Sequence, residues 1–248
     1  TGGGGTGSTT AGTGGGDPTA LSPCLNSAEL VTAIGSAKSG TVFKLDLCTI
    51  EGPLRIPAGV TVQGLGKGMS RISSKAGTFA VDLIPGKDPA RLTGVTIASS
   101  GTAAIASSGE GSVEIEDVEV QIGRGVGIAA EKLSSLSLKH VSVTGLVTDR
   151  TAHAYPPEVS PKNAPTHGVV ALGIPSVTLD DVSIAGLADF GAVFLDSTLS
   201  WTGGGTSSTL GTGLFVGGGT TTLTNVSLCG TFRGNRKGPA VNGAFTGK

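Results

Sequence analysis

Most of the side chains that could carry chemistry in this sequence lie in one segment, residues 147–166, or shortly after it. The segment reads VTDRTAHAYPPEVSPKNAPT, and His167 follows it directly. Its candidates, with two carboxylates further along, are Asp149, Arg150, His153, Tyr155, Glu158, Lys162, His167, Asp189 and Asp196. Polar loops held on a rigid scaffold commonly carry binding and catalytic groups. We therefore expect any site of this protein to lie at this segment.

The residue types suit a reaction on a glycosidic bond. Two carboxylates with a histidine and an arginine can hydrolyse a glycoside by acid–base catalysis. The catalytic candidates are Asp149, Arg150, His153, His167 and Asp189, and the ligand-contact candidates are Tyr155, Glu158, Lys162, Asp196 and Trp201. Trp201 and Phe190 are candidate platforms for stacking on a sugar ring. The alternative for residues 147–166 is a surface loop without function, because insertions cost little free energy. The alternative for Trp201 is burial in the core.

The rest of the chain is a repeat that would position these residues. One series has central valines at Val95, Val118, Val141, Val182 and Val226, which step by 23, 23, 41 and 44 residues. The step of 41 is one unit plus the insertion, and the step of 44 is two units. A second series, aligned on Gly77, Gly101, Gly125, Gly168, Gly191 and Gly213, steps by 24, 24, 43, 23 and 22. A fixed period of this size predicts a solenoid.

Each unit contains short segments in which apolar residues alternate with polar ones, separated by Gly, Ser, Asp or Asn. This pattern predicts strands of three to five residues that recur once per turn and lie parallel, about 4.8 Å apart. The fold class is therefore all-β, a parallel β-helix of roughly seven to nine rungs. The residues just before the central valines are Gly94, Asp117, His140, Asp181 and Asn225. We interpret them as corner residues that bond the local backbone, not as catalytic groups.

Three regions are expected along the chain. Residues 1–17 are a flexible leader rich in Gly, Ser and Thr. Residues 18–40 form a helical cap, because Asn26 and Glu29 make a capping-box pattern before an apolar stripe. Residues 41–248 form the β-helix, and we expect the natural chain to continue past Lys248, where a fresh rung has just begun.

The charge and the cysteine content of the chain argue against several classes of function. The formal net charge is −1, which predicts no nucleic-acid partner, and no apolar run is long enough to span a membrane. Cys24 and Cys48 flank the cap and the first strand. They either form a disulfide or are small buried apolar residues. No cysteine spacing indicates zinc, and we assign no metal ligands.

The stretch IPAGVTVQGLGKG at residues 56–68, followed by units of the form Val-x-Leu-x-x-Val-x-Ile-x-Gly, resembles the right-handed β-helix, pectate-lyase-like superfamily. The resemblance covers about residues 41–245. It implies a right-handed solenoid and, if the protein is a lyase, a Ca²⁺ held by carboxylates with Arg150 as the base. The leader resembles the tether of bacterial surface lipoproteins. That implies an exported protein, extracellular or on the cell surface, with a lipid anchor upstream of residue 1. The alternative is that the leader is a linker from a neighbouring domain.

The superfamily's catalytic motifs are missing from the sequence. The Asn-Thr-Asp and Arg-Ile-Lys motifs of galacturonan hydrolases are absent, as are the Trp-Ile-Asp-His and Arg-x-Pro-x-x-Arg patterns of pectate lyases. We therefore expect a monomeric binding or scaffold module for a polysaccharide or a cell-surface protein, with no cofactor. The alternative is a divergent polysaccharide lyase or glycoside hydrolase with its site around residues 147–166.

Overall fold

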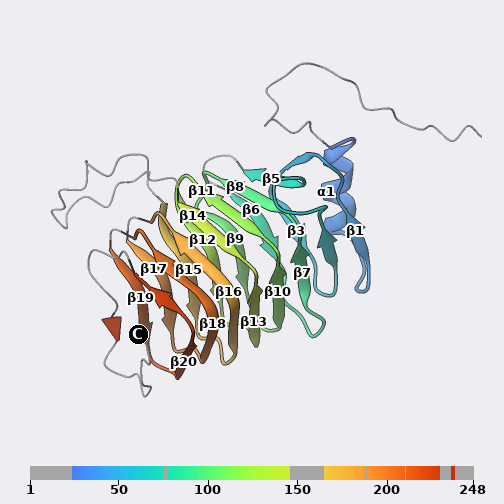
Figure 1. Cartoon of the computed structure of the whole chain (residues 1–248). Helices are drawn as coiled ribbons and strands as arrows, with labels where there is room; N and C mark the ends of the chain where they lie inside the picture. Colours follow the sequence, from blue (N-terminus) through green and yellow to red (C-terminus); the bar gives the residue numbers. More distant parts are fainter. Residues whose placement is uncertain are drawn as a thin grey trace, which may run out of the picture.

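The computed structural model describes residues 24–74, 78–145, 165–187, 189–209, 211–229 and 236–237. The predicted leader at residues 1–17 and the last eleven residues fall outside these ranges. The described chain is an all-β parallel solenoid of about seven turns with one short helix near its N-terminal end (Figure 1). Within it, no helix is long and apolar enough to cross a bilayer.

The elements of the solenoid are short, as the spacing of turn residues requires. In chain order they are α1 (Ser27–Gly35), β1 (Val42–Lys44), β2 (Thr49–Glu51), β3 (Leu54–Ile56), β4 (Thr61–Gln63), β5 (Arg71–Ser74), β6 (Phe79–Leu83), β7 (Ala90–Thr93), β8 (Thr96–Ser99), β9 (Ala103–Ser108), β10 (Ser112–Glu116), β11 (Glu119–Ile122), β12 (Gly125–Glu131), β13 (Ser135–Lys139), β14 (Ser142–Gly145), β15 (Pro165–Leu172), β16 (Val177–Ala185), β17 (Phe190–Leu195), β18 (Leu199–Ser207), β19 (Thr212–Gly217), β20 (Thr221–Thr224), β21 (Ser227–Leu228) and β22 (Arg236–Lys237).

Strands from successive turns stack into two sheets. The eight-stranded sheet runs in the order β22-β19-β17-β15-β12-β9-β6-β3. The fourteen-stranded sheet has two halves, which β16 and β18 join by running through both. Between β10 and β11, and at the equivalent point of other turns, a single residue with positive φ makes the corner. The predicted corner residues Gly94, Asp117, His140, Asp181 and Asn225 all have φ between 50° and 65°.

The glycine series needs a correction in one unit. The structure places Gly127, not Gly125, opposite Gly168, and Gly191 and Gly213 continue that column. The column steps by 41, 23 and 22 residues, which agrees with the step of 41 in the valine series. Gly125 itself has φ 75° and lies at a register shift where β12 begins. Because Gly125 and Gly127 are only two residues apart, the sequence alone allows either of them to be aligned with Gly168.

The N-terminal end of the stack is covered by α1, which lies against β2 and β3 (Figure 1). Ile34 is fully buried, and Leu30 and Val31 pack partly against the core. The predicted capping box is wrong, because Asn26 has φ 53° and its side chain makes no cap hydrogen bond. Cys24 and Cys48 form a disulfide that joins the residues before α1 to the residue before β2. Cys229 is a free, exposed thiol.

Candidate functional site

Six of the predicted site residues lie in the part of the insertion outside the described residues. They are Asp149, Arg150, His153, Tyr155, Glu158 and Lys162. Their roles stay predictions. The structure does place the other four, His167, Asp189, Asp196 and Trp201, and it brings only two of them together.

Trp201 does not offer a surface to a ligand. It lies on β18 with its side chain pointing into the solenoid, where it is fully buried. Within the described chain its indole N–H has no hydrogen-bond partner. This corrects the prediction of Trp201 as a stacking platform, since a ring without exposed area cannot contact a sugar.

Asp196 does not share a site with Asp189. The two residues lie at opposite ends of β17, so about 3.3 Å per residue puts them about 23 Å apart. The two carboxyl groups of a glycoside hydrolase lie roughly 5–10 Å apart. Asp196 therefore cannot act together with Asp189, and it is an exposed corner residue with φ 49°. The other candidate carboxylate, Asp149, lies outside the described residues.

His167 and Asp189 are brought together at the start of β15 and β17. The backbone N–H of Asp189 donates to the carbonyl of Thr166 at 3.0 Å. Burial lowers the pKa of His167 below its ordinary value, and the charge of Asp189 partly opposes that shift. The Nδ1 atom of His167 is buried without a hydrogen-bond partner among the described residues. The imidazole is therefore neutral near pH 7 and one of its nitrogens is unpaired.

Aromatic rings continue from His167 across the neighbouring turns. His167 stacks on Phe190, with ring centroids 5.2 Å apart and 21° between their planes. Phe190 meets Phe215 edge to face, with centroids 6.0 Å apart. The three rings come from β15, β17 and β19, which are consecutive neighbours in the eight-stranded sheet (Figure 1).

These rings belong to an apolar strip on the outer face of that sheet. His167, Val170 and Leu172 are half-buried, whereas the intervening Gly168, Val169 and Ala171 face the core and are fully buried. The next two turns continue the strip. We call the half-buried residues His167, Val170, Leu172, Phe190, Leu195 and Phe215 the apolar shelf.

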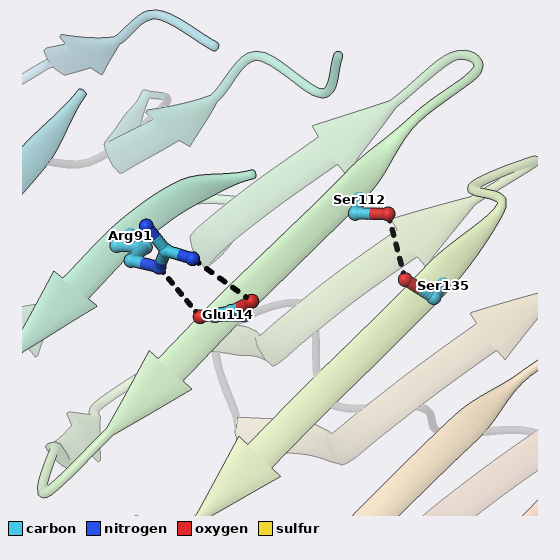
Figure 2. A network of polar contacts seen from close by, with 4 residues as sticks. All are labelled: Arg91, Ser112, Glu114 and Ser135. Atoms are coloured by element: carbon cyan, nitrogen blue, oxygen red, sulfur yellow. Dashed lines mark hydrogen bonds and ion pairs between the residues drawn. The ribbon is translucent and has the colours of Figure 1, made fainter. Parts of the chain in front are cut away.

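The outer face of the fourteen-stranded sheet has the opposite character. Arg91 pairs with Glu114 at 2.6 Å, and the hydroxyl of Ser135 donates to Ser112 at 2.8 Å (Figure 2). Further along, the outward residues of β16, β18 and β20 are exposed or half-exposed and polar. Contiguous apolar patches are uncommon on the surfaces of soluble proteins, which makes the apolar shelf a candidate contact surface.

Of the shelf residues, the sequence analysis named only His167 and Phe190 as candidates. The signal was present in the sequence, since residues 167–172 are apolar at nearly every position and do not alternate as a half-exposed strand should. Only the register shows that some of them point outward.

A second group of polar side chains lies at the corner between the halves of the fourteen-stranded sheet. The Nδ1 atom of His140 is 3.2 Å from Oδ1 of Asp117 on the preceding turn. Glu116 adjoins them, and single ligand atoms of Glu116, Asp117 and His140 lie within 4.8 Å of one another. Asp117 also lines an open cleft of about 410 Å³ beside Gln63 and Lys67. The predicted corner positions of Asp117 and His140 are confirmed by their positive φ, but the approach of Glu116 to these two residues was not predicted.

The lowered pKa of His167 predicts a pH-dependent stability. A folded-state pKa below the unfolded value means that protonation favours unfolding. The free energy of unfolding is therefore highest above about pH 6.5 and falls as the pH drops through that value. We expect the variant His167→Phe, which keeps a ring on Phe190, to lose less stability than the unmodified protein as the pH falls. Urea unfolding at pH 7.5, 6.5 and 5.5 measures the free energy of unfolding of both proteins. An equal fall in that free energy for the two proteins would contradict the prediction.

Comparison with known proteins adds an architectural neighbour. No protein-family model matches this chain, and no curated protein is similar to it in sequence. Among solved structures, an alginate lyase from Paenibacillus sp. str. FPU-7 is similar, with a TM-score of 0.41 and 13% sequence identity. The match covers 89% of this chain and 98% of that one. With a TM-score below 0.5, it assigns no activity and no residue to this protein.

Proposed function

We propose that this protein is an exported binding module that holds a polysaccharide against its apolar shelf. The observation that carries the proposal is the row of His167, Phe190 and Phe215 on the outer face of the eight-stranded sheet. The disulfide between Cys24 and Cys48 supports export, because such bonds persist in oxidising compartments. The disulfide and the resemblance of residues 1–17 to a lipoprotein tether support a location on the outer surface of a bacterial cell.

The chemistry of the shelf fits a sugar chain better than a charged or wholly apolar ligand. A pyranose ring has apolar C–H faces that pack on aromatic rings, and hydroxyl groups around its edge that need hydrogen-bond partners. The shelf supplies the rings. At one end it also supplies the imidazole of His167 and the carboxylate of Asp189. Because β15, β17 and β19 are about 4.8 Å apart, a chain lying along the solenoid axis would cross all three.

The enzyme alternative also has one observation in its favour. A neutral imidazole beside a carboxylate is a combination that general-base catalysis uses, and His167 with Asp189 provides it. We prefer the binding function because the sequence lacks the catalytic motifs of the superfamily's lyases and hydrolases.

The test is retention of the intact protein on immobilised acidic and neutral polysaccharides, with and without Ca²⁺. We expect the protein to be retained on at least one of them. Phe190→Ala should weaken binding about tenfold to thirtyfold, because truncating a central aromatic contact typically costs about 1.5–2 kcal/mol. Thr202→Ala, on the polar outer face of β18, is the matched control and should bind like the unmodified protein.

The same fractions should be assayed for unsaturated products and new reducing ends. Product formation that is lost in His167→Ala would replace the binding proposal with the enzyme alternative. Absence of retention on every polysaccharide would overturn the proposal and favour a protein on the cell surface as the partner. Equal weakening by Phe190→Ala and Thr202→Ala would show that the shelf is not the contact surface.

A further inference from the structure

The corner cluster is held in place by the backbone of two adjacent turns. The N–H of Asp117 donates to the carbonyl of Lys139 at 3.0 Å, and the N–H of His140 donates to that of Asp180 at 2.8 Å. Both residues have the left-handed conformation, with φ of 52° and 51°. These contacts fix where the side chains start, so Asp117 and His140 face each other without ordering a loop.

The donor atoms have the spacing of a metal site. Ligands of a tetrahedral ion with bonds of 2.0–2.1 Å are about 3.3 Å apart. The observed 3.2 Å between Nδ1 of His140 and Oδ1 of Asp117 matches this edge. One ligand atom of Glu116 lies within 4.8 Å of one ligand atom of Asp117 and one of His140, so the side chain of Glu116 must turn towards an ion to bind it.

We propose that Glu116, Asp117 and His140 bind a divalent transition-metal ion of the zinc class. An imidazole with two carboxylates suits Zn²⁺ and its neighbours in the first row, whereas Ca²⁺ and Mg²⁺ prefer oxygen ligands alone. The ion takes the lone pair of Nδ1 of His140, which leaves the imidazole proton on Nε2. The cleft beside Asp117 leaves room for water on the remaining coordination positions. The site is on the other sheet from the shelf and does not depend on the proposed function.

Two ammonium groups compete with a cation at the cluster. One of them, Nζ of Lys67, donates a hydrogen bond to the carbonyl oxygen of His140 at 2.6 Å. The ammonium of Lys139 lies 3.0 Å from Oε1 of Glu116. It must move away when Glu116 turns towards the ion. Removing this ammonium should therefore tighten metal binding, which a purely structural corner would not predict.

The experiment is calorimetric titration of the EDTA-treated, dialysed full chain with zinc chloride at pH 7.5. We expect one ion to bind per chain. His140→Asn and Asp117→Asn should each weaken binding at least tenfold. Both are expected to fold, because asparagine occupies the same left-handed corner at Asn225. Lys139→Gln should tighten binding by up to about fivefold.

Glu131→Gln is the matched control for nonspecific attraction of cations. Glu131 is a half-exposed carboxylate paired with Lys132 at 2.8 Å, much as Glu116 is paired with Lys139. The Glu131→Gln variant should bind zinc with the same affinity as the unmodified chain. A zinc-induced rise in Tm that is lost in His140→Asn provides a second readout. No zinc binding, or undiminished binding by His140→Asn, would overturn the proposal.

Discussion

Replacing Val182 by Asp is expected to leave no folded protein at 25 °C. Val182 follows the corner residue Asp181 on β16, and its side chain is fully buried. The substitution loses the burial of the valine and places a carboxylate without a partner in the core, which together cost about 5–8 kcal/mol. That is comparable to the whole stability of a typical domain. Circular dichroism and size-exclusion chromatography of the purified variant measure the outcome.

Ser183→Asp is the control for this substitution. Ser183 is the next residue on the same strand and is exposed, so the same charge should change the free energy of unfolding by less than about 0.5 kcal/mol. A soluble, monomeric Val182→Asp variant with cooperative unfolding would show that the inward and outward positions of β16 have been assigned wrongly.

Replacing Gly191 by Ala is expected to cost about 2–4 kcal/mol, because the added methyl group has no room. A Cβ at this position would lie 2.4 Å from the carbonyl oxygen of Gly213 and 2.9 Å from a side-chain carbon of Thr206. The oxygen belongs to the backbone of the next turn and cannot shift without moving that strand. Urea unfolding should show a lower midpoint with an unchanged m-value.

Gly173→Ala provides a comparison in which the cause is different. A Cβ at Gly173 meets no atom within 4 Å, but the residue has φ 63°. Alanine there should cost only the left-handed conformation, about 1–2 kcal/mol. If Gly191→Ala is no more destabilising than Gly173→Ala, close contact between turns is not the reason for the glycine column.

The fold could be predicted because it repeats. Val95, Val118, Val141 and Val182 recur once per turn, and a solenoid is the architecture that buries such a series. The corners followed from the same alignment, since Asp117 and Asn225 are residue types that tolerate positive φ. Periodicity reports which residues are equivalent from turn to turn, and equivalence is enough to define the stack.

Details that depend on a single turn were predicted less well. Gly125 and Gly127 are both plausible repeat glycines, and only the backbone shows which one faces Gly168. Asn26 matched a capping pattern, but its own φ of 53° prevents the capping geometry. Trp201 could be a surface platform or a core residue by its sequence context, and the structure confirms the core alternative, because its neighbours on β18 point outward and the tryptophan inward.

The site was harder still, because it depends on which face each residue occupies. His167 and Asp189 became candidates by residue type, whereas nothing in the sequence singled out Phe215 or Leu172, which are half-buried. Asp117 and His140 were predicted as corner residues of one column, whereas the approach of Glu116 to them was not predicted. Residues of neighbouring turns that are 23 positions apart in sequence become close neighbours, and pairs of columns must be compared to see it.

The disulfide between Cys24 and Cys48 also determines how the solenoid bears mechanical load. A pulling force applied to the chain before Cys24 passes through the sulfur bridge directly to the residue that precedes β2. The helix α1 and strand β1 lie inside the closed covalent loop and carry none of the tension. The force then meets β2, which lies side by side with β5 in the stack. Pulling on the chain before Cys24 would therefore load the hydrogen bonds between β2 and β5, and α1 would stay folded.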